Sequence, residues 1–275
     1  MIIGWGVTDY HRPIVIEYPR DLMNTVLSSP RPIRTAGRVG LLVSIRSIDE
    51  LRVVAGLGVD VIDFKEPRDG PLAAASADIW RAAADDPAVT ERLSAALGEC
   101  DAAVDLAAAV PPRFRYAKAG PAGMTTTARL TVGWGEIAAA LPGEVELVAV
   151  AYADHRLANC PPPEVVFAAA AEIGLRTWLI DTFDKTATRD TPSCLGRQSL
   201  RRIDQLARAA DAEWVLAGSI RTAVATELME EGIRPTLFGV RGDVCDGSRS
   251  GKLVAERVRR WVDLASSGRQ TAAEG

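Results

Sequence analysis

The feature that most constrains the fold is an eightfold alternation of short apolar runs and helix-forming segments. The apolar runs are residues 40–45, 59–65, 92–98, 114–120, 145–154, 176–183, 212–219 and 236–242. Continuous apolar runs of this length are typical of parallel strands buried on both faces. Eight strand–helix units therefore predict an α/β protein with a closed (β/α)8 TIM barrel. A doubly wound open sheet is the alternative, but no Gly-x-Gly-x-x-Gly follows the first strand.

The alternation divides the chain into three parts. Residues 39–265 are predicted to form the barrel, and the 275-residue length suits one such domain. Residues 1–38, rich in Pro and Arg, precede it as an N-terminal extension, and the small polar residues 266–275 predict a flexible tail. The predicted helices lie near 47–56, 76–86, 100–109, 134–141, 163–173, 197–210, 221–231 and 252–264.

Composition excludes several classes of protein. The 32 basic and 36 acidic residues give a net charge of −4, which argues against a nucleic-acid partner. No window approaches about 18 uninterrupted apolar residues, and the N-terminus lacks a basic head followed by an apolar run. We therefore expect no membrane partner and a cytoplasmic location. Four widely spaced cysteines are expected as free thiols, and with two histidines we predict neither a metal site nor a cofactor.

The lysines are few and unevenly placed. The sequence has 28 arginines but four lysines, and three of the four fall at or just past the predicted carboxyl ends of strands two, four and six. The active site of a (β/α)8 barrel lies at that end. Lys252 begins a predicted helix and is expected on the surface. With the aspartates that close strands two and six, the candidate catalytic residues are Lys65, Lys118, Lys185, Asp63 and Asp181.

Lysine differs from arginine because it can lose its proton and act as a nucleophile or a base. Burial, or a second ammonium group nearby, lowers the pKa of a lysine and provides the amine for a Schiff base. Asp63 and Lys65 are two residues apart on a strand and are predicted to face the same way, into the barrel. The alternative is that they form a buried ion pair that only stabilises the strand.

The predicted ends of strands seven and eight combine glycines with arginines. Barrels commonly bind a substrate phosphate at these two loops, where glycines allow backbone N–H groups to approach the anion and arginine binds it bidentately. The alternative is that the glycines only form turns and that the arginine after strand one is a solvated loop charge. The candidate phosphate-binding residues are Gly218, Ser219, Arg221, Gly239, Arg241, Gly242 and Arg46.

Seven stretches of this sequence carry a family resemblance: LLVSIRS, GVDVIDFKEPRDGPLAA, YAKAG, VAYAD, LIDTFDKT, LAGSIR and GVRGDVC. In this order they resemble the (5-formylfuran-3-yl)methyl phosphate synthases, also called 4-(hydroxymethyl)-2-furancarboxaldehyde-phosphate synthases. DFKEP and DTFDK are the more specific motifs. Residues 1–38 precede the usual start of the family, and residues 99–113 offer little to match.

The resemblance implies a lyase that joins two molecules of glyceraldehyde 3-phosphate, without metal or cofactor, with loss of phosphate and water. Its furan product would be a precursor of methanofuran-type one-carbon carriers. By the resemblance, Lys65 forms the Schiff base, Lys118 accepts a proton, and Asp63, Asp181 and Lys185 complete the site. We also expect a homo-oligomer. The alternatives are another class I aldolase, a sugar-phosphate isomerase, or a phosphate-metabolite sensor without turnover.

Overall fold

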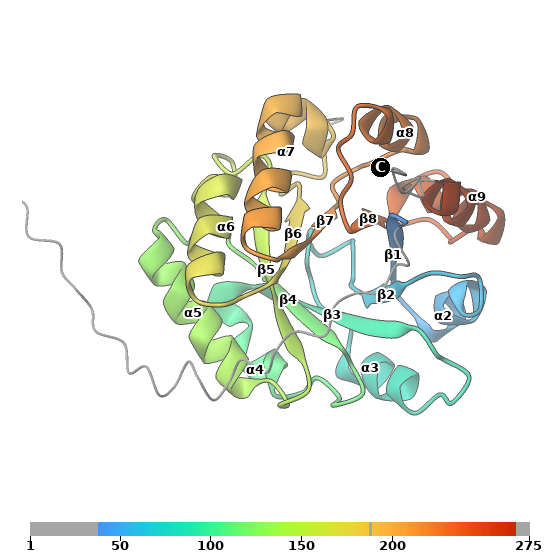
Figure 1. Cartoon of the computed structure of the whole chain (residues 1–275). Coiled ribbons are helices and arrows are strands. Elements are labelled where there is room, and N and C mark those ends of the chain that lie inside the picture. Colours follow the sequence, from blue (N-terminus) through green and yellow to red (C-terminus); the bar gives the residue numbers. More distant parts are fainter. Residues whose placement is uncertain (1–37, 187–188, 268–275) are drawn as a thin grey trace, which may run out of the picture.

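A closed barrel of eight parallel strands forms the centre of the molecule, with helices packed around its outside (Figure 1). The computed structural model describes residues 38–186 and 189–267. The strands follow one another in sequence order, and β8 pairs with β1 to close the ring. The prediction of a (β/α)8 barrel is confirmed. The predicted extension lies outside the described residues except for its last residue, as does the tail beyond Ser267.

All eight strands lie within the predicted apolar runs or exceed them by one residue. Their bounds are β1 Gly40–Ile45, β2 Val61–Phe64, β3 Arg92–Glu99, β4 Tyr116–Gly120, β5 Glu146–Tyr152, β6 Thr177–Asp181, β7 Glu213–Leu216 and β8 Leu237–Val240. The helices are α2 Ile48–Val54, α3 Ala77–Ala84, α4 Val104–Ala107, α5 Thr127–Ala140, α6 Pro163–Glu172, α7 Thr191–Ala209, α8 Thr222–Glu230 and α9 Ala255–Ser267. Two 3₁₀ turns, η1 Cys100–Ala102 and η2 Gly242–Val244, follow β3 and β8.

Three helices differ from the prediction. The helix expected over 100–109 is reduced to η1 and the four-residue α4, just before the Pro111–Pro112 pair. Helix α5 begins seven residues earlier than expected, where the Thr126 side chain accepts a hydrogen bond from the Arg129 amide. Helix α7 also begins earlier and is kinked at Gly196, whose φ is +77°. Local capping and glycine geometry therefore set these boundaries, which apolar spacing alone does not reveal.

Alternation along the strands separates two cores. One set of strand side chains points outward and packs against the helices. The other set points into the barrel, where the apolar side chains include Leu42, Val61, Val148, Leu179 and Leu237. These inward side chains fill the amino-terminal and middle parts of the barrel, as is usual for this fold. The buried charged side chains of Asp63, Lys65 and Asp181 lie toward the carboxyl ends of their strands.

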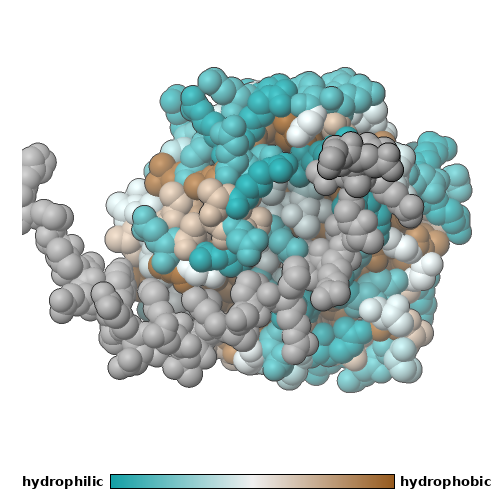
Figure 2. All heavy atoms as spheres, in the orientation of Figure 1, coloured by the Kyte–Doolittle hydropathy of each residue, from teal (hydrophilic) through white to brown (hydrophobic). Residues whose placement is uncertain are grey.

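The helices present a mainly hydrophilic outer surface. In Figure 2, hydrophilic residues cover the region of α7 and α8, whereas apolar residues gather over α6, where Val165 is 44% exposed. Within residues 38–186 and 189–267, no helix is long and apolar enough to cross a membrane. All four cysteines are free thiols, as expected.

Candidate active site

A pocket of about 590 Å³ opens over the carboxyl ends of the strands. Seven basic side chains but only three carboxylates line it. Four of the five candidate catalytic residues are among its lining, and Asp63 lies beneath it with no exposed surface. The pocket is therefore suited to an anionic ligand. The charged lining residues are Lys65, Lys118, Lys185, Arg221, Arg241, Arg249, Arg257, Asp181, Asp190 and Asp243.

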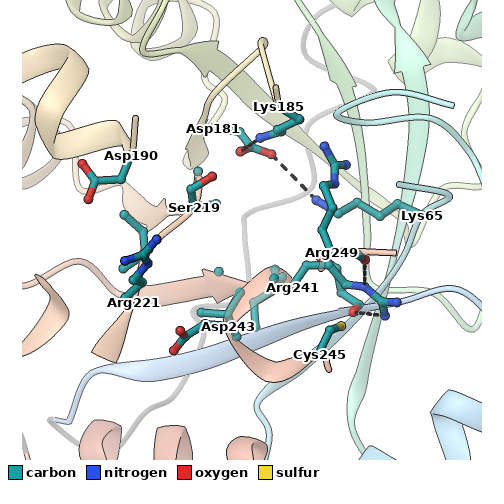
Figure 3. A pocket seen from close by; sticks show the side chains of 18 of the residues that line it. Lys65, Asp181, Lys185, Asp190, Ser219, Arg221, Arg241, Asp243, Cys245 and Arg249 are labelled. Carbon is teal, nitrogen blue, oxygen red and sulfur yellow. Dashed lines mark hydrogen bonds and ion pairs between the residues drawn. The ribbon is translucent and has the colours of Figure 1, made fainter. Parts of the chain in front are cut away.

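Two lysines share one carboxylate in this pocket. Asp181, the last residue of β6, accepts a short hydrogen bond from Lys185 Nζ, and its other oxygen lies 3.8 Å from Lys65 Nζ. Lys185 Nζ also donates to the Thr182 hydroxyl at 2.8 Å. Figure 3 shows the Lys65 ammonium reaching across the pocket toward Asp181, with Lys185 on the other side of that carboxylate.

This arrangement changes the protonation of both partners. Burial lowers the pKa of Lys65 to about 8, and the neighbouring Lys185 and Lys118 ammonium groups act in the same direction, against the attraction of Asp181. Burial alone would raise the pKa of Asp181, but Lys185 and Lys65 together lower it to about 2. Burial likewise lowers the pKa of Lys185. Lys65 is thus a buried amine that is far easier to deprotonate than a free lysine.

Lys118 is paired with Asp63 instead. Lys118 Nζ lies 2.7 Å from Asp63 Oδ1, and both side chains are almost fully buried. The hydroxyls of Ser44 and Ser94 each donate to Asp63 at 2.9 Å. Asp63 and Lys65 do share the interior face, as predicted, but the alternative that they pair with each other is wrong. Asp63 bonds to β4 and Lys65 to β6, which leaves the Lys65 amine at the pocket surface.

A second polar pair, Glu99 and Tyr152, joins the ends of β3 and β5, and Glu99 is not among the candidate residues predicted from the sequence. The Tyr152 hydroxyl donates to Glu99 Oε1 at 2.7 Å, and the Ala122 amide donates to Oε2 at 3.0 Å. A shift in register after Ala96 accompanies Gly98, whose φ is +85°. Such a bulge re-aims the next side chain, here Glu99. A glycine before a carboxylate at the end of a strand is the signal that could have identified it.

The loop that carries Lys185 is attached to the end of β5. The carboxylate of Asp154 accepts hydrogen bonds from the amides of Phe183 at 2.6 Å and Asp184 at 2.8 Å. The Phe183 ring also packs edge-on against Tyr152, with 5.3 Å between ring centroids. Asp154 thus fixes the backbone between Asp181 and Lys185.

The predicted phosphate-binding loops lie together at the opposite side of the pocket. Gly218 and Ser219 both have positive φ, +90° and +58°, a conformation that can turn successive N–H groups toward an anion. Gly218 also has a packing role, because a Cβ there would lie 2.1 Å from Thr191 Oγ1. Gly239 and Gly242 line the same region, together with the exposed Arg221 at the start of α8. We call Gly218, Ser219, Gly239 and Gly242 the glycine cradle.

The other two predicted phosphate ligands have different partners. Arg241 is buried, and all five of its N–H donors are used by Glu50 and by the carbonyls of Ser44, Arg249 and Gly251. Arg46 donates to the Ser250 carbonyl at 2.9 Å and lies 3.4 Å from Glu66. In this structure the guanidinium of Arg241 has no donor left for a phosphate, because the partly buried Glu50 carboxylate and three carbonyls satisfy it.

The closed barrel and its lysine-lined pocket define the chain as a (β/α)8-barrel protein whose site lies above the carboxyl ends of the strands. The profile of the 4-HFC-P synthase family matches residues 41–262, and the chain belongs to this family. The (5-formylfuran-3-yl)methyl phosphate synthases of Methanosarcina acetivorans and Methanosarcina mazei are each 28% identical to it over 230 residues. Both alignments cover 81% of this chain and 97% of the relative. The family and these relatives are named as synthases, which supports the conclusion that this chain is an enzyme.

Solved structures share the fold at lower identity. KGPDC from Streptococcus mutans has a TM-score of 0.55 and 14% identity, covering 83% of this chain and 98% of its own. Phosphoribosyl anthranilate isomerase from Thermus thermophilus has a TM-score of 0.52 and 15% identity, covering 83% and 99%. These similarities concern the barrel alone.

Proposed function

We propose that this protein condenses two molecules of glyceraldehyde 3-phosphate into (5-formylfuran-3-yl)methyl phosphate through a Schiff base on Lys65. The product would serve the biosynthesis of methanofuran-type cofactors. Family membership supports the reaction, and the names of the Methanosarcina relatives support the product. The observation that carries the mechanism is the buried Lys65 amine, beside Asp181 and Lys185 in a basic pocket.

The first step requires a neutral amine. Lys65 Nζ adds to the carbonyl of one triose phosphate, and water leaves as the iminium forms. The positive iminium acidifies the adjacent C–H, and loss of that proton gives an enamine. We assign the proton acceptor as Lys118, acting together with Asp63, whose carboxylate lies 2.7 Å from the Lys118 amine.

The remaining steps build the ring. The enamine carbon attacks the aldehyde of the second triose phosphate, and the Asp181–Lys185 pair donates the proton that the new alkoxide requires. Loss of one phosphate, dehydration, ring closure and hydrolysis of the imine release the furan and free Lys65. In total, two triose phosphates yield one phosphorylated furan aldehyde, one inorganic phosphate and two waters.

Borohydride trapping tests the assignment. Incubation with glyceraldehyde 3-phosphate and borohydride should reduce the imine and attach the triose to Lys65, which peptide mass spectrometry would locate. Lys65→Arg keeps the charge but cannot form an imine, so both the adduct and the near-ultraviolet absorbance of the furan should be lost. Lys252→Arg, at an exposed position before α9, is the matched control and should retain both.

The products distinguish the alternatives. An aromatic aldehyde formed from glyceraldehyde 3-phosphate alone supports the furan synthase. A trapped Lys65 adduct with a non-aromatic product would indicate another class I aldolase, and interconversion of triose phosphates a sugar-phosphate isomerase. Binding without any turnover would indicate a metabolite sensor. Furan formation by Lys65→Arg at the wild-type rate would contradict the proposed mechanism.

A further inference from the structure

Two arginines that the sequence suggests as phosphate ligands instead hold one short segment of the β8–α9 loop. Arg241 donates from Nε to the Arg249 carbonyl at 2.8 Å and from Nη2 to the Gly251 carbonyl at 3.1 Å. Arg46 donates to the carbonyl between them, that of Ser250, at 2.9 Å. Three consecutive carbonyls are therefore fixed by two guanidinium groups, so the backbone at Arg249 is held in one position.

The same segment is closed tightly on itself. A Cβ on Gly251 would lie 1.8 Å from the Asp246 carbonyl oxygen, so the backbone there admits only glycine. The Asp246 amide donates to the Lys252 carbonyl at 2.8 Å, and Cys245 forms an antiparallel bridge with Leu253. The loop is thus built as a rigid support, and the charged side chain that residues 245–253 present to the pocket is Arg249.

Arg249 reaches into the pocket on the side of the lysines. Figure 3 shows its side chain extending past the Lys65 ammonium, away from the glycine cradle residue Ser219. Its Nη2 donates to the Gly70 carbonyl at 3.1 Å, which joins the β8–α9 loop to the β2–α3 loop. In the part of the chain that the structure describes, no carboxylate lies within ion-pair distance of this guanidinium.

The local charge balance is positive. Lys65, Lys185 and Arg249 contribute three positive charges when protonated. Asp181 and Glu66 attract Arg249, but Asp181 is shared between the two lysines and Glu66 pairs with Arg46. Partly buried positive charges without a counterion are costly, and a dianionic phosphate group would neutralise them. A guanidinium with free N–H donors binds phosphate bidentately, whereas the cradle binds through backbone groups.

We propose that Arg249 forms a second phosphate-binding position in this pocket, separate from the glycine cradle, for the phosphate of a second triose phosphate. The inference rests on the proposed function, which requires two phosphorylated trioses in one site. Two anion-binding positions on opposite sides of the Lys65 amine would hold both substrates with their carbonyl ends close together. Arg46 and Arg241 then act as positioning residues for Arg249.

Calorimetric titration with inorganic phosphate tests the inference independently of furan formation. The wild-type protein should bind two phosphates per chain, and Arg249→Gln should bind one. Arg249→Lys keeps the charge without the planar fork and should bind the second phosphate about 10-fold more weakly. Arg259→Gln is the matched control, because Arg259 lies on α9 with its side chain 55% exposed and paired with Glu256. It should bind two.

Kinetics give a second readout. With glyceraldehyde 3-phosphate, Arg249→Gln should raise KM about 10- to 100-fold and lower kcat much less. Borohydride trapping of unphosphorylated glyceraldehyde should still label Lys65, which would show that the variant is folded and its amine intact. One phosphate per wild-type chain, or unchanged phosphate binding by Arg249→Gln, would overturn the inference. If phosphate binding behaves as expected but no furan forms, the proposed function fails and the Arg249 site stands.

Discussion

Lys65 Nζ lies 3.8 Å from Asp181 Oδ2, and this contact joins strand β2 to strand β6 across the mouth of the barrel. Asp181 lies closer to Lys185 than to Lys65, so its negative charge only partly neutralises Lys65. Burial without full compensation lowers the pKa of the amine to about 8. The contact therefore positions the amine while leaving its proton easy to remove.

The rate of imine formation is expected to depend on pH through this amine. The neutral fraction of Lys65 increases as pH rises, with its midpoint at the pKa of about 8. Single-turnover trapping at saturating glyceraldehyde should therefore accelerate about 10-fold from pH 7 to pH 9 and then level off. A rate that stays constant over this interval, or rises only above pH 10, would contradict a lowered pKa for Lys65.

Stability should also depend on Lys65. Its pKa is lower in the folded chain than the ordinary 10.5, so the unfolded chain binds more protons between pH 8 and pH 10.5. The free energy of unfolding is therefore expected to increase as pH rises through this interval. Below pH 8, the destabilisation that comes from burying the protonated Lys65 amine is fully present. Urea titrations of wild type and Lys65→Met at pH 7 and pH 10 measure it. Lys65→Met should lack this increase in unfolding free energy between pH 7 and pH 10. An equal pH dependence of the unfolding free energy in both proteins would contradict a lowered pKa for Lys65.

The buried Lys118–Asp63 pair should make a large difference to stability when one partner is removed. Lys118→Met leaves the fully buried Asp63 carboxylate with two serine hydroxyls and should cost about 3–5 kcal/mol of unfolding free energy. The double variant Lys118→Met/Asp63→Asn should recover part of this loss, because no unpaired charge remains. Furan formation should be absent from both. A denaturant-based double-mutant cycle gives the coupling, and strictly additive losses would contradict a direct pair.

Gly120, the last residue of β4, should not tolerate a side chain. A Cβ there would lie 2.2 Å from Glu99 Oε2 and 2.3 Å from the Tyr152 hydroxyl oxygen. Gly120→Ala should therefore separate this hydrogen-bonded pair and lower the free energy of unfolding by about 1–3 kcal/mol. Gly135→Ala is the control, since Gly135 lies exposed in α5 with open space around it, and it should stabilise by about 0.5–1 kcal/mol. Thermal unfolding of both variants checks the contrast.

Asp154 should influence turnover through the position of Lys185. Asp154→Ala removes the acceptor for the Phe183 and Asp184 amides, so the loop between Asp181 and Lys185 loses its attachment to β5. We expect kcat to fall at least 10-fold, with a smaller fall in Asp154→Asn, which keeps one acceptor oxygen.

Asp60→Ala provides the comparison for Asp154. Asp60 accepts the Leu41 amide and pairs with Arg38 just before β2, at the opposite end of the barrel. The Asp60→Ala substitution should reduce the melting temperature without a comparable loss of kcat. If both alanine variants lowered kcat equally, the effect of Asp154 would be one of stability rather than of position.

The sequence predicted the strands better than the helices. Continuous apolar runs mark parallel strands directly, because these are buried on both faces. The start of α5 depends on the hydrogen bond between Thr126 and Arg129, and two glycines weaken the helical pattern that follows it. Helix boundaries are therefore set by local contacts that the apolar pattern does not encode.

The sequence by itself determined that Lys65, Lys118 and Asp181 would meet at one end of a barrel, because residue alternation and strand direction are local properties. It did not determine their partners. Closure of the ring brings β2 opposite β6 and within reach of β4, which is separated from it by β3. Only that arrangement pairs Lys118 with Asp63 and Lys65 with Asp181. It also decided that the guanidinium of Arg241, although it lines the pocket, binds Glu50, about 190 residues away along the chain, and has no donor left for a ligand. Ion pairs form between groups that are close in space, and spatial proximity between distant segments exists only once the chain has folded.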